Sequence, residues 1–278
     1  MAWETGTAAG HKDLLAKLKT FALMHGWTLE RYLTPLDGEH ELWLSSTGLS
    51  GQESIKVGYQ TTSSDSNDTF NLKLKVSVLF SSGSSFDTMP NSSGTKYIYL
   101  WQNPITYYFL INQDRIVILA QVSTKTQLSY SGKLRTYCSL GHWPRQVVVF
   151  GTSNHDSGRW SSEGADYSNF QSLNSRNNEY LWVDNTFKVS NRSFPRQTTL
   201  PILTGELVTP PSERWMLQMF CIHDERGAIG EFQGCFYIVG RNTSTGQKFS
   251  SPDGLREFVV VQNVHRTGFA DYIALELK

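Results

Sequence analysis

The sequence predicts a mainly β protein: an antiparallel β-sandwich-like body with one amphipathic α-helix near the N-terminus. Aromatic residues make up 13% of the 278 residues, and aromatic and β-branched side chains favour pleated sheets. Gly, Asn and Ser are abundant between the apolar runs and supply turns. Most apolar runs are short or alternate with polar residues, whereas one stretch has the apolar spacing of a helix.

The helix is expected over His11–Met24, where apolar residues recur at spacings of three and four. They form one stripe, made of Leu14, Leu15, Leu18, Phe21 and Ala22. Asp13 lies in the first turn, where a negative charge suits the helix dipole, and Gly26 is well placed to end the helix. We expect the N-terminal segment, residues 1–33, to dock on or near the β body, with the helix capping a sheet.

A first β-rich region is expected over residues 34–151. Asn71–Phe80 alternates apolar and polar residues, which predicts a half-buried strand, and the turn Asn112–Arg115 joins the clearest hairpin. Thr61–Thr69 and Ser81–Gly94 are polar and are predicted to be exposed loops. Up to residue 151 the expected strands are Trp27–Leu33, His40–Ser45, Asn71–Phe80, Ile105–Ile111, Ile116–Val122, one near Gln127–Tyr137, and Val147–Phe150.

Residues 152–178 lose hydrophobic periodicity and are rich in Ser, Asn and Gly, so we expect a surface excursion that divides the chain. The composition of Ser157–Asn178 resembles that of adaptable recognition loops. A second β-rich region, residues 179–278, can share one sheet system with the first, and a proline-marked connector precedes Trp215. Its expected strands are Glu179–Val183, Trp215–Ile222, Gly234–Val239, Glu257–Val264 and Asp271–Leu277.

The charge pattern excludes some classes of partner. The chain has 25 basic and 25 acidic residues and no Lys/Arg-rich run, whereas nucleic-acid-binding surfaces show a clustered basic excess. The apolar runs are far shorter than the roughly 20 residues that span a bilayer. The start, Met1–Thr5, lacks the basic and apolar regions of a secretory signal. We therefore expect no nucleic acid, no membrane insertion, and synthesis in a cytoplasm.

No residues stand out as a metal, cofactor or catalytic site. Cys138, Cys221 and Cys235 are an odd and sparse set, which favours free buried thiols over disulfides. Cys221, His223 and Cys235 lack a Cys-x-x-Cys pair and a fourth ligand for zinc. His223-Asp224-Glu225 and His155-Asp156 are interpreted as solvated turns. The common nucleophile, zinc and phosphate-binding motifs are missing, so we expect a protein that is not an enzyme and uses no cofactor.

Aromatic and apolar side chains are the candidates for an interface. The aromatic side chains in Tyr97–Trp101 and Tyr107–Phe109 can fill a core, bind a protein partner or stack on sugar rings. Because side chains alternate along a strand, half of them are expected to point into the core. The interface candidates are Trp3, Leu14, Leu18, Phe21, Trp101, Tyr107, Trp160 and Tyr167.

Three stretches resemble a family of tailed-bacteriophage virion structural proteins. The opening stretch comprises Trp3–Ala8, His11–Leu15 and His25–Thr28. The middle stretch comprises Leu100–Phe109, Asn112 and Arg115–Val117. The end stretch comprises Glu257–Gly268 and Asp271–Leu275. The resemblance leaves residues 152–178 uncovered. It implies a particle component and no catalytic residues.

The resemblance leads to the expectation of a tail-tip or baseplate subunit that links tail and fibre parts through protein–protein contacts. Its expected partners are other virion proteins and copies of itself, and its expected location is the virion tail after synthesis in the bacterial host cytoplasm. The alternatives are a receptor- or carbohydrate-binding tail protein and a neck or collar protein, with a polysaccharide-degrading enzyme ranked below them. We also expect a chain lacking residues 1–26 to fold but not to enter particles.

Overall fold

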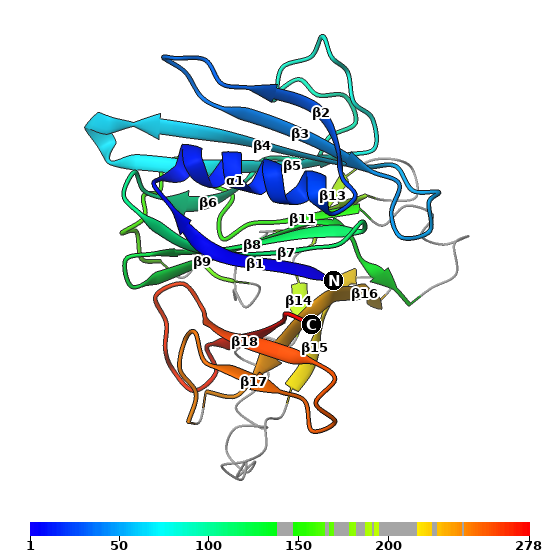
Figure 1. The fold of residues 1–278 in the computed structure, drawn as a ribbon, viewed down its shortest axis with the longest axis vertical. Coiled ribbons are helices and arrows are strands. Elements are labelled where there is room, and N and C mark those ends of the chain that lie inside the picture. The colour runs from blue at the N-terminus through cyan, green and yellow to red at the C-terminus, as the bar shows by residue number, and fades with distance from the viewer. Residues whose placement is uncertain are drawn as a thin grey trace.

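The computed structural model shows a mainly β protein built from three antiparallel sheets, with one α-helix among the described residues, α1 (His11–Met24). The predicted fold class and helix bounds are confirmed. Figure 1 shows the sheets as three stacked layers, which we call the upper, central and lower sheets. The structure describes residues 1–137, 147–164, 167–169, 178–181, 187–190, 192–194, 216–223, 227–240 and 242–278.

Every strand pairing in the three sheets is antiparallel. In spatial order, the upper sheet contains β2 (Thr28–Leu33), β3 (Glu41–Ser46), β4 (Ile55–Ser64), β5 (Thr69–Ser77) and β6 (Lys96–Leu100). The central sheet contains β1 (Ala2–Ala8), β7 (Ile105–Ile111), β8 (Arg115–Val122), β9 (Lys125–Lys133), β11 (Val147–Phe150), β12 (Asn178–Leu181) and β13 (Phe187–Ser190). The lower sheet contains β14 (Arg192–Phe194), β15 (Met216–His223), β16 (Gly227–Ile238), β19 (Tyr272–Glu276), β18 (Glu257–Gln262) and β17 (Lys248–Ser250), with β10 (Arg135–Thr136) paired to β16.

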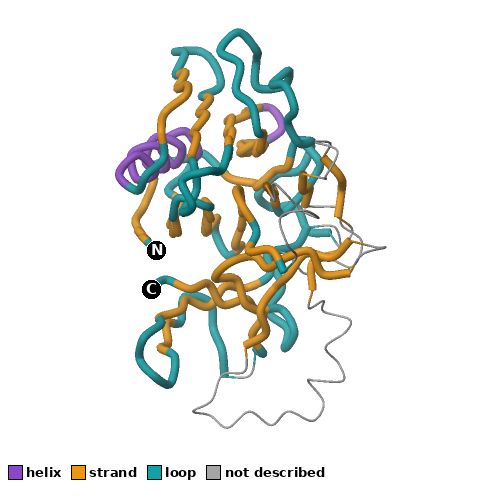
Figure 2. The backbone as a smooth tube through the Cα atoms, turned by 90° about the vertical axis from the view of Figure 1, so that its right-hand side faces the viewer, coloured by secondary structure: helices purple, strands orange, loops and turns teal. Residues whose placement is uncertain are grey.

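The central sheet is buried on both faces. Along β8, Ile116 and Ile118 point into the core shared with the upper sheet, and Val117 points into the core shared with the lower sheet. A strand covered on both sides needs apolar residues at consecutive positions, which explains the unbroken run Ile116–Ala120 and the apolar strand β11. In the second view the layers remain stacked, and both views place the two chain ends close together (Figures 1 and 2).

Helix α1 fills the open side between the upper and central sheets (Figure 1). Its apolar stripe, including Leu14, Leu18 and Phe21, is buried in the core that these sheets share. Beyond the helix C-terminus, the Trp27 indole N–H donates to the Asn112 carbonyl at 2.8 Å. Residues 1–26 supply the edge strand β1 and the helix that covers this core, and the expectation that a chain lacking them still folds stays a prediction.

Two predictions about the upper sheet are corrected. The strand predicted at Asn71–Phe80 ends at Ser77. It is buried on both faces, because the loop after it covers the outer face. The Lys75 ammonium donates a hydrogen bond to the Asp87 carbonyl of that loop at 3.1 Å. Thr61–Ser64 is part of β4 rather than a loop. The Glu39 carboxylate accepts hydrogen bonds from the Thr61 and Ser63 hydroxyls at 2.6 and 2.7 Å, which satisfies this polar strand end.

The predicted hairpin over residues 105–122 is confirmed, and β12, β15, β16, β18 and β19 lie at predicted strands. Six of the described strands were not predicted as such: β1, β4, β6, β13, β14 and β17. The sheets also divide the chain differently from the expected regions, since β12 and β13 extend the central sheet and β10 joins the lower one. The connector containing Pro201, Pro210 and Pro211 lies outside the described residues.

Gly132 lies in the central sheet with φ +136°, a backbone conformation that L side chains rarely adopt. A Cβ atom there would overlap the carbonyl oxygen of Asp114. Replacing Gly132 by Ala should therefore lower the free energy of unfolding by more than about 3 kcal/mol, measured by urea denaturation. Gly83→Ala is the control, because no atom lies within 4 Å of a Cβ built at Gly83. Equal stability of the two variants would contradict this account.

His11, the first residue of α1, is only 6% exposed and packs against the Phe70 ring at 5.4 Å between ring centroids. Its side-chain Nε2 has no hydrogen-bond partner within the part of the chain described here. Loss of hydration on burial lowers the pKa of His11 from 6.5 to about 4, although the nearby Glu39 opposes the shift. The folded protein therefore holds this imidazole neutral at pH values where the unfolded chain protonates it.

The sign of the resulting pH dependence follows from this lowered pKa. Below pH 6.5 the unfolded chain binds a proton at His11 that the folded chain does not bind until about pH 4. The part of the unfolding free energy that comes from keeping His11 neutral is therefore present above pH 6.5 and is lost as the pH falls toward 4. Between pH 7.5 and 5 the loss of unfolding free energy should be about 2 kcal/mol smaller in His11→Gln than in the native chain. The exposed His155→Gln serves as control and should leave the slope unchanged.

Candidate functional site

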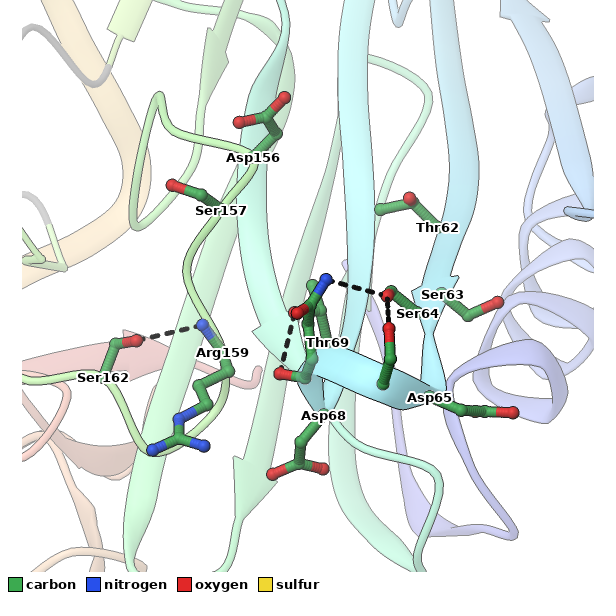
Figure 3. Close-up of a pocket in the computed structure, with 12 residues that line it drawn as sticks. Thr62, Ser63, Ser64, Asp65, Asp68, Thr69, Asp156, Ser157, Arg159 and Ser162 are labelled. Carbon is green, nitrogen blue, oxygen red and sulfur yellow. Dashed lines mark hydrogen bonds between the residues drawn. The ribbon is translucent and has the colours of Figure 1, made fainter.

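An open polar groove lies between the tip of the β4–β5 hairpin and the loop after β11 (Figure 3). Its volume is about 820 Å³, and its lining consists of Thr62–Thr69 on the hairpin side and Asp156, Ser157, Arg159 and Ser162 on the loop side. All of these side chains carry hydroxyl, amide, carboxylate or guanidinium groups. No aliphatic or aromatic hydrophobic residue lines the groove.

The hairpin tip is shaped by hydrogen bonds among its own residues. Asp65–Asn67 forms a single 3₁₀ turn, and Asp68 follows in the left-handed conformation with φ 51°, which Asp tolerates better than most residues. The Asn67 side-chain amide donates to the Ser64 hydroxyl at 3.0 Å, and the Ser64 and Ser66 hydroxyls lie 3.2 Å apart. Short polar side chains therefore fix the shape of this wall of the groove.

The opposite wall is a loop that the upper sheet holds by its backbone carbonyls. The side-chain amide of Asn71 on β5 donates to the carbonyls of Asp156 at 3.3 Å and Gly158 at 2.9 Å. The Tyr99 hydroxyl on β6 lies 2.9 Å from the His155 carbonyl. A Cβ atom at Gly158 would overlap the Tyr99 ring, so only glycine allows the loop to lie this close to the sheet.

Two cations hold the next part of the loop. Lys125 on β9 is 6% exposed, and its ammonium donates to the Ser161 carbonyl at 2.6 Å and pairs with Glu163 at 3.0 Å. Arg266 donates to the carbonyls of Gly164 at 2.6 Å and Tyr167 at 2.9 Å. Hydrogen bonds from charged donors are stronger than those between neutral groups, so these contacts restrain the loop.

Asn169 anchors the far end of the loop between the central and lower sheets. It is fully buried, and its side-chain amide donates to the carbonyls of Thr126 at 2.9 Å and Gln262 at 3.1 Å. Its side-chain oxygen accepts the Leu128 N–H at 3.1 Å. Because Thr152, Ser153, Ser168 and Asn169 are also buried, the prediction of a surface excursion over 152–178 is wrong for these described residues.

Trp160 connects the two walls. Its indole N–H donates to the Asp68 carboxylate at 2.9 Å, and its ring lies 5.3 Å from that of Trp101. The Trp101 indole N–H in turn donates to the Pro104 carbonyl at 3.1 Å. Both indoles are half-buried and pack against the core between the upper and central sheets.

Not all groove side chains are used in holding the structure. The Arg159 guanidinium and the Asp156 carboxylate are exposed, and neither makes a hydrogen bond or ion pair with another side chain or backbone group in the described ranges. The Ser162 hydroxyl accepts the Arg159 backbone N–H at 3.0 Å, which fixes the start of the Arg159 side chain (Figure 3). Arg159 and Asp156 are thus charged groups on a restrained backbone, available to a ligand.

The structure brings together three of the eight interface candidates and separates the rest. Trp101, Trp160 and Tyr167 lie at or near the anchored loop, where the Tyr167 ring meets the Tyr99 ring at 5.2 Å. Trp3 on β1 is half-buried between Tyr108 and the Lys248 ammonium, which lies 4.3 Å from its ring centroid. The other candidates are buried in the core, namely Leu14, Leu18, Phe21 and Tyr107, and Phe21 and Tyr107 also line a second pocket.

The cysteines and the predicted polar turns add no further site. Cys221 and Cys235 are free and buried, as predicted, and burial raises the pKa of the Cys235 thiol to about 12, so it stays protonated. Cys138, Asp224 and Glu225 lie outside the described residues. Across the described ranges, no group of three or more His, Cys, Asp or Glu residues is arranged to hold a metal ion.

Comparison with known proteins gives no relative for this chain: no protein-family model matches it, and its sequence matches no curated protein. In the described part of the chain, no helix has the length and apolarity needed to cross a membrane.

The anchoring of the loop leads to a prediction about local stability. Replacing Lys125 by Met removes the donor to the Ser161 carbonyl and the partner of Glu163. Backbone amides of residues 159–164 should then exchange with deuterium at least about tenfold faster, while amides of β7 and β8 keep their rates. Lys17→Met, on the exposed side of α1, is the matched control. Unchanged exchange of the loop in Lys125→Met would contradict the anchoring role.

Proposed function

We propose that this chain is a non-enzymatic structural subunit of a tailed-bacteriophage virion, at the tail tip or baseplate, where it links tail and fibre parts through protein–protein contacts. The observation that carries the proposal is that the three stretches resembling virion proteins pack into one block. The opening pairs with the middle: β1 runs antiparallel to β7 over its whole length, from Ala2 opposite Ile111 to Ala8 opposite Ile105.

The end of the chain completes the same block. Val259 and Val261 on β18 and Leu275 on β19 lie in the core between the lower and central sheets, together with Val117 from the middle stretch. The stretches are separated by more than a hundred residues at one point, yet they form one frame from which the loops extend. A resemblance that follows such a frame supports a shared fold, and the role as a particle component is proposed by analogy with that fold.

The upper sheet supports a role in protein contacts. Its edge strand β2 is one of the few places where large apolar side chains are exposed on regular structure, with Leu29 42% and Leu33 48% exposed. Exposed edge strands offer unpaired backbone groups, and apolar side chains there favour association with another chain. The expected partners are other virion proteins and further copies of this chain.

The neck or collar is a second place where the same contacts would serve, and locating the chain in intact particles by electron microscopy distinguishes it from the baseplate. The groove and its loop suit binding in either place. Their polar groups stand on a restrained backbone, and a surface restrained in this way loses little conformational entropy when it binds.

The edge of the upper sheet gives the test. The double substitution Leu29→Lys and Leu33→Lys should leave the unfolding free energy within about 0.5 kcal/mol of the native value, because both side chains are exposed. Incorporation into particles, measured by quantitative mass spectrometry, should fall at least about tenfold, since charges would replace apolar contacts. Leu255→Lys, 72% exposed on the lower part of the molecule, is the control.

Two results would overturn the proposal. One is the absence of the native chain from purified particles. The other is release of oligosaccharide from bacterial surface polysaccharide by the purified native chain, since that would make it an enzyme.

A further inference from the structure

The groove between the β4–β5 hairpin and the anchored loop has the chemistry of a ligand site that protein–protein contacts do not explain. Stable protein interfaces have an apolar centre surrounded by a polar rim. The groove lining instead carries seven hydroxyl side chains together with amide, carboxylate and guanidinium groups. Its volume of about 820 Å³ falls within the range of sites for small molecules, roughly 300–1,000 Å³.

The groups available to a ligand are complementary to sugar hydroxyls. A sugar hydroxyl both donates and accepts hydrogen bonds, so the hydroxyl groups along a sugar chain can bind a carboxylate at one place and a guanidinium at another. Asp156 supplies an acceptor and Arg159 supplies donors, and both side chains are exposed and unpaired within the described ranges. Figure 3 shows both on the loop wall beside the hairpin tip, with the Asp156 carboxylate and the Arg159 guanidinium pointing in opposite directions along the groove.

The walls hold their positions without a ligand. On the loop side, Asn71, Tyr99 and Lys125 bind backbone carbonyls, so the loop does not depend on Asp156 or Arg159 for its shape. On the hairpin side, the Trp160 indole fixes the Asp68 carboxylate. Trp160 also places a half-buried aromatic ring at the margin of the groove, next to Arg159, where a sugar ring can rest against it.

The charge of the groove narrows the class of ligand. Asp65, Asp68 and Asp156 oppose the single positive charge of Arg159, so the lining has a net negative charge. An anionic polysaccharide would be repelled, whereas an uncharged sugar chain meets no such penalty. We propose that this groove binds an uncharged, hydroxyl-rich glycan chain, with Asp156 and Arg159 as the hydrogen-bonding side chains and Trp160 at the margin. The inference does not depend on the proposed place in a virion.

The test is affinity electrophoresis of the full chain in native gels that contain dextran, mannan or galactan, compared with gels that contain polygalacturonate. Migration of the native chain should be retarded by at least one of the three uncharged polymers and not by the anionic one. Asp156→Ala and Arg159→Ala should each weaken the apparent affinity by at least about tenfold, the effect of losing a hydrogen bond to a charged group. Trp160→Phe keeps an aromatic ring but loses the N–H to Asp68 and should weaken binding less.

Asp37→Asn is the matched control, because Asp37 is exposed in the turn between β2 and β3 and does not line the groove. It should bind as the native chain does, and thermal unfolding of the Asp156, Arg159 and Asp37 variants should match the native curve. Three results would overturn the inference: no retardation in any uncharged gel, retardation that survives both Asp156→Ala and Arg159→Ala, or tighter binding to polygalacturonate than to the uncharged polymers. Salt-sensitive binding of polylysine without any glycan binding would instead identify the groove as a site for basic peptides and would also overturn it.

Discussion

Burial of the central sheet on both faces is the constraint on which the rest of the structure depends. Its strands β7 and β8 supply side chains to the core shared with the upper sheet and to the core shared with the lower sheet, and β9 supplies Leu128 and Tyr130 to the lower one. Because side chains alternate along a strand, each residue can serve only one of these cores, and nearly every position must be apolar or hydrogen-bonded. The helix is part of the same arrangement, since it closes the side where the upper and central sheets diverge.

Some polar residues inside this stack join the layers by hydrogen bonds. Asn169 uses both its amide hydrogens and its oxygen to connect β9 with the end of β18. Leaving such a buried group unpaired costs about 1–3 kcal/mol, so the network selects one arrangement of the lower sheet against the central one. The same physical requirement restrains the loop, because its backbone carbonyls lie near the sheets and must find donors such as Lys125 and Arg266.

Sequence patterns predicted the parts of the fold that depend on local order. The stripe of α1 and the hairpin over residues 105–122 are encoded by spacing within one segment, and both bounds agree with the structure. The strand β1 was missed because Trp3–Ala8 contains three polar residues and a glycine and gains its strand conformation from pairing with β7. Burial on the outer face of β5 was missed because alternation shows which residues share a face, but not that the loop after the strand folds back over that face.

The candidate site could be predicted only in part. Composition indicated a recognition surface over Ser157–Asn178, and Trp160 was singled out as an aromatic candidate. The anchoring residues Asn71, Lys125 and Arg266 gave no signal, because their partners lie 36 to 102 positions away, and an isolated Lys or Asn in a strand pattern suggests a solvent-facing position. Only the folded chain shows that these residues bind the loop backbone.

The position of the groove follows from the same stacking. A long hairpin such as β4–β5 must extend beyond the apolar core to turn, and there its side chains face water and are free to be polar. The loop after β11 crosses beside this turn because β6 and β9 supply donors for its carbonyls and because Gly158 permits close approach to Tyr99. Two polar segments, held mainly by the β body and joined to each other by the hydrogen bond from Trp160 to Asp68, therefore meet without closing on one another. In the space left between them, the side chains of Asp156 and Arg159 do not hold either segment, and such side chains are free to be selected for binding.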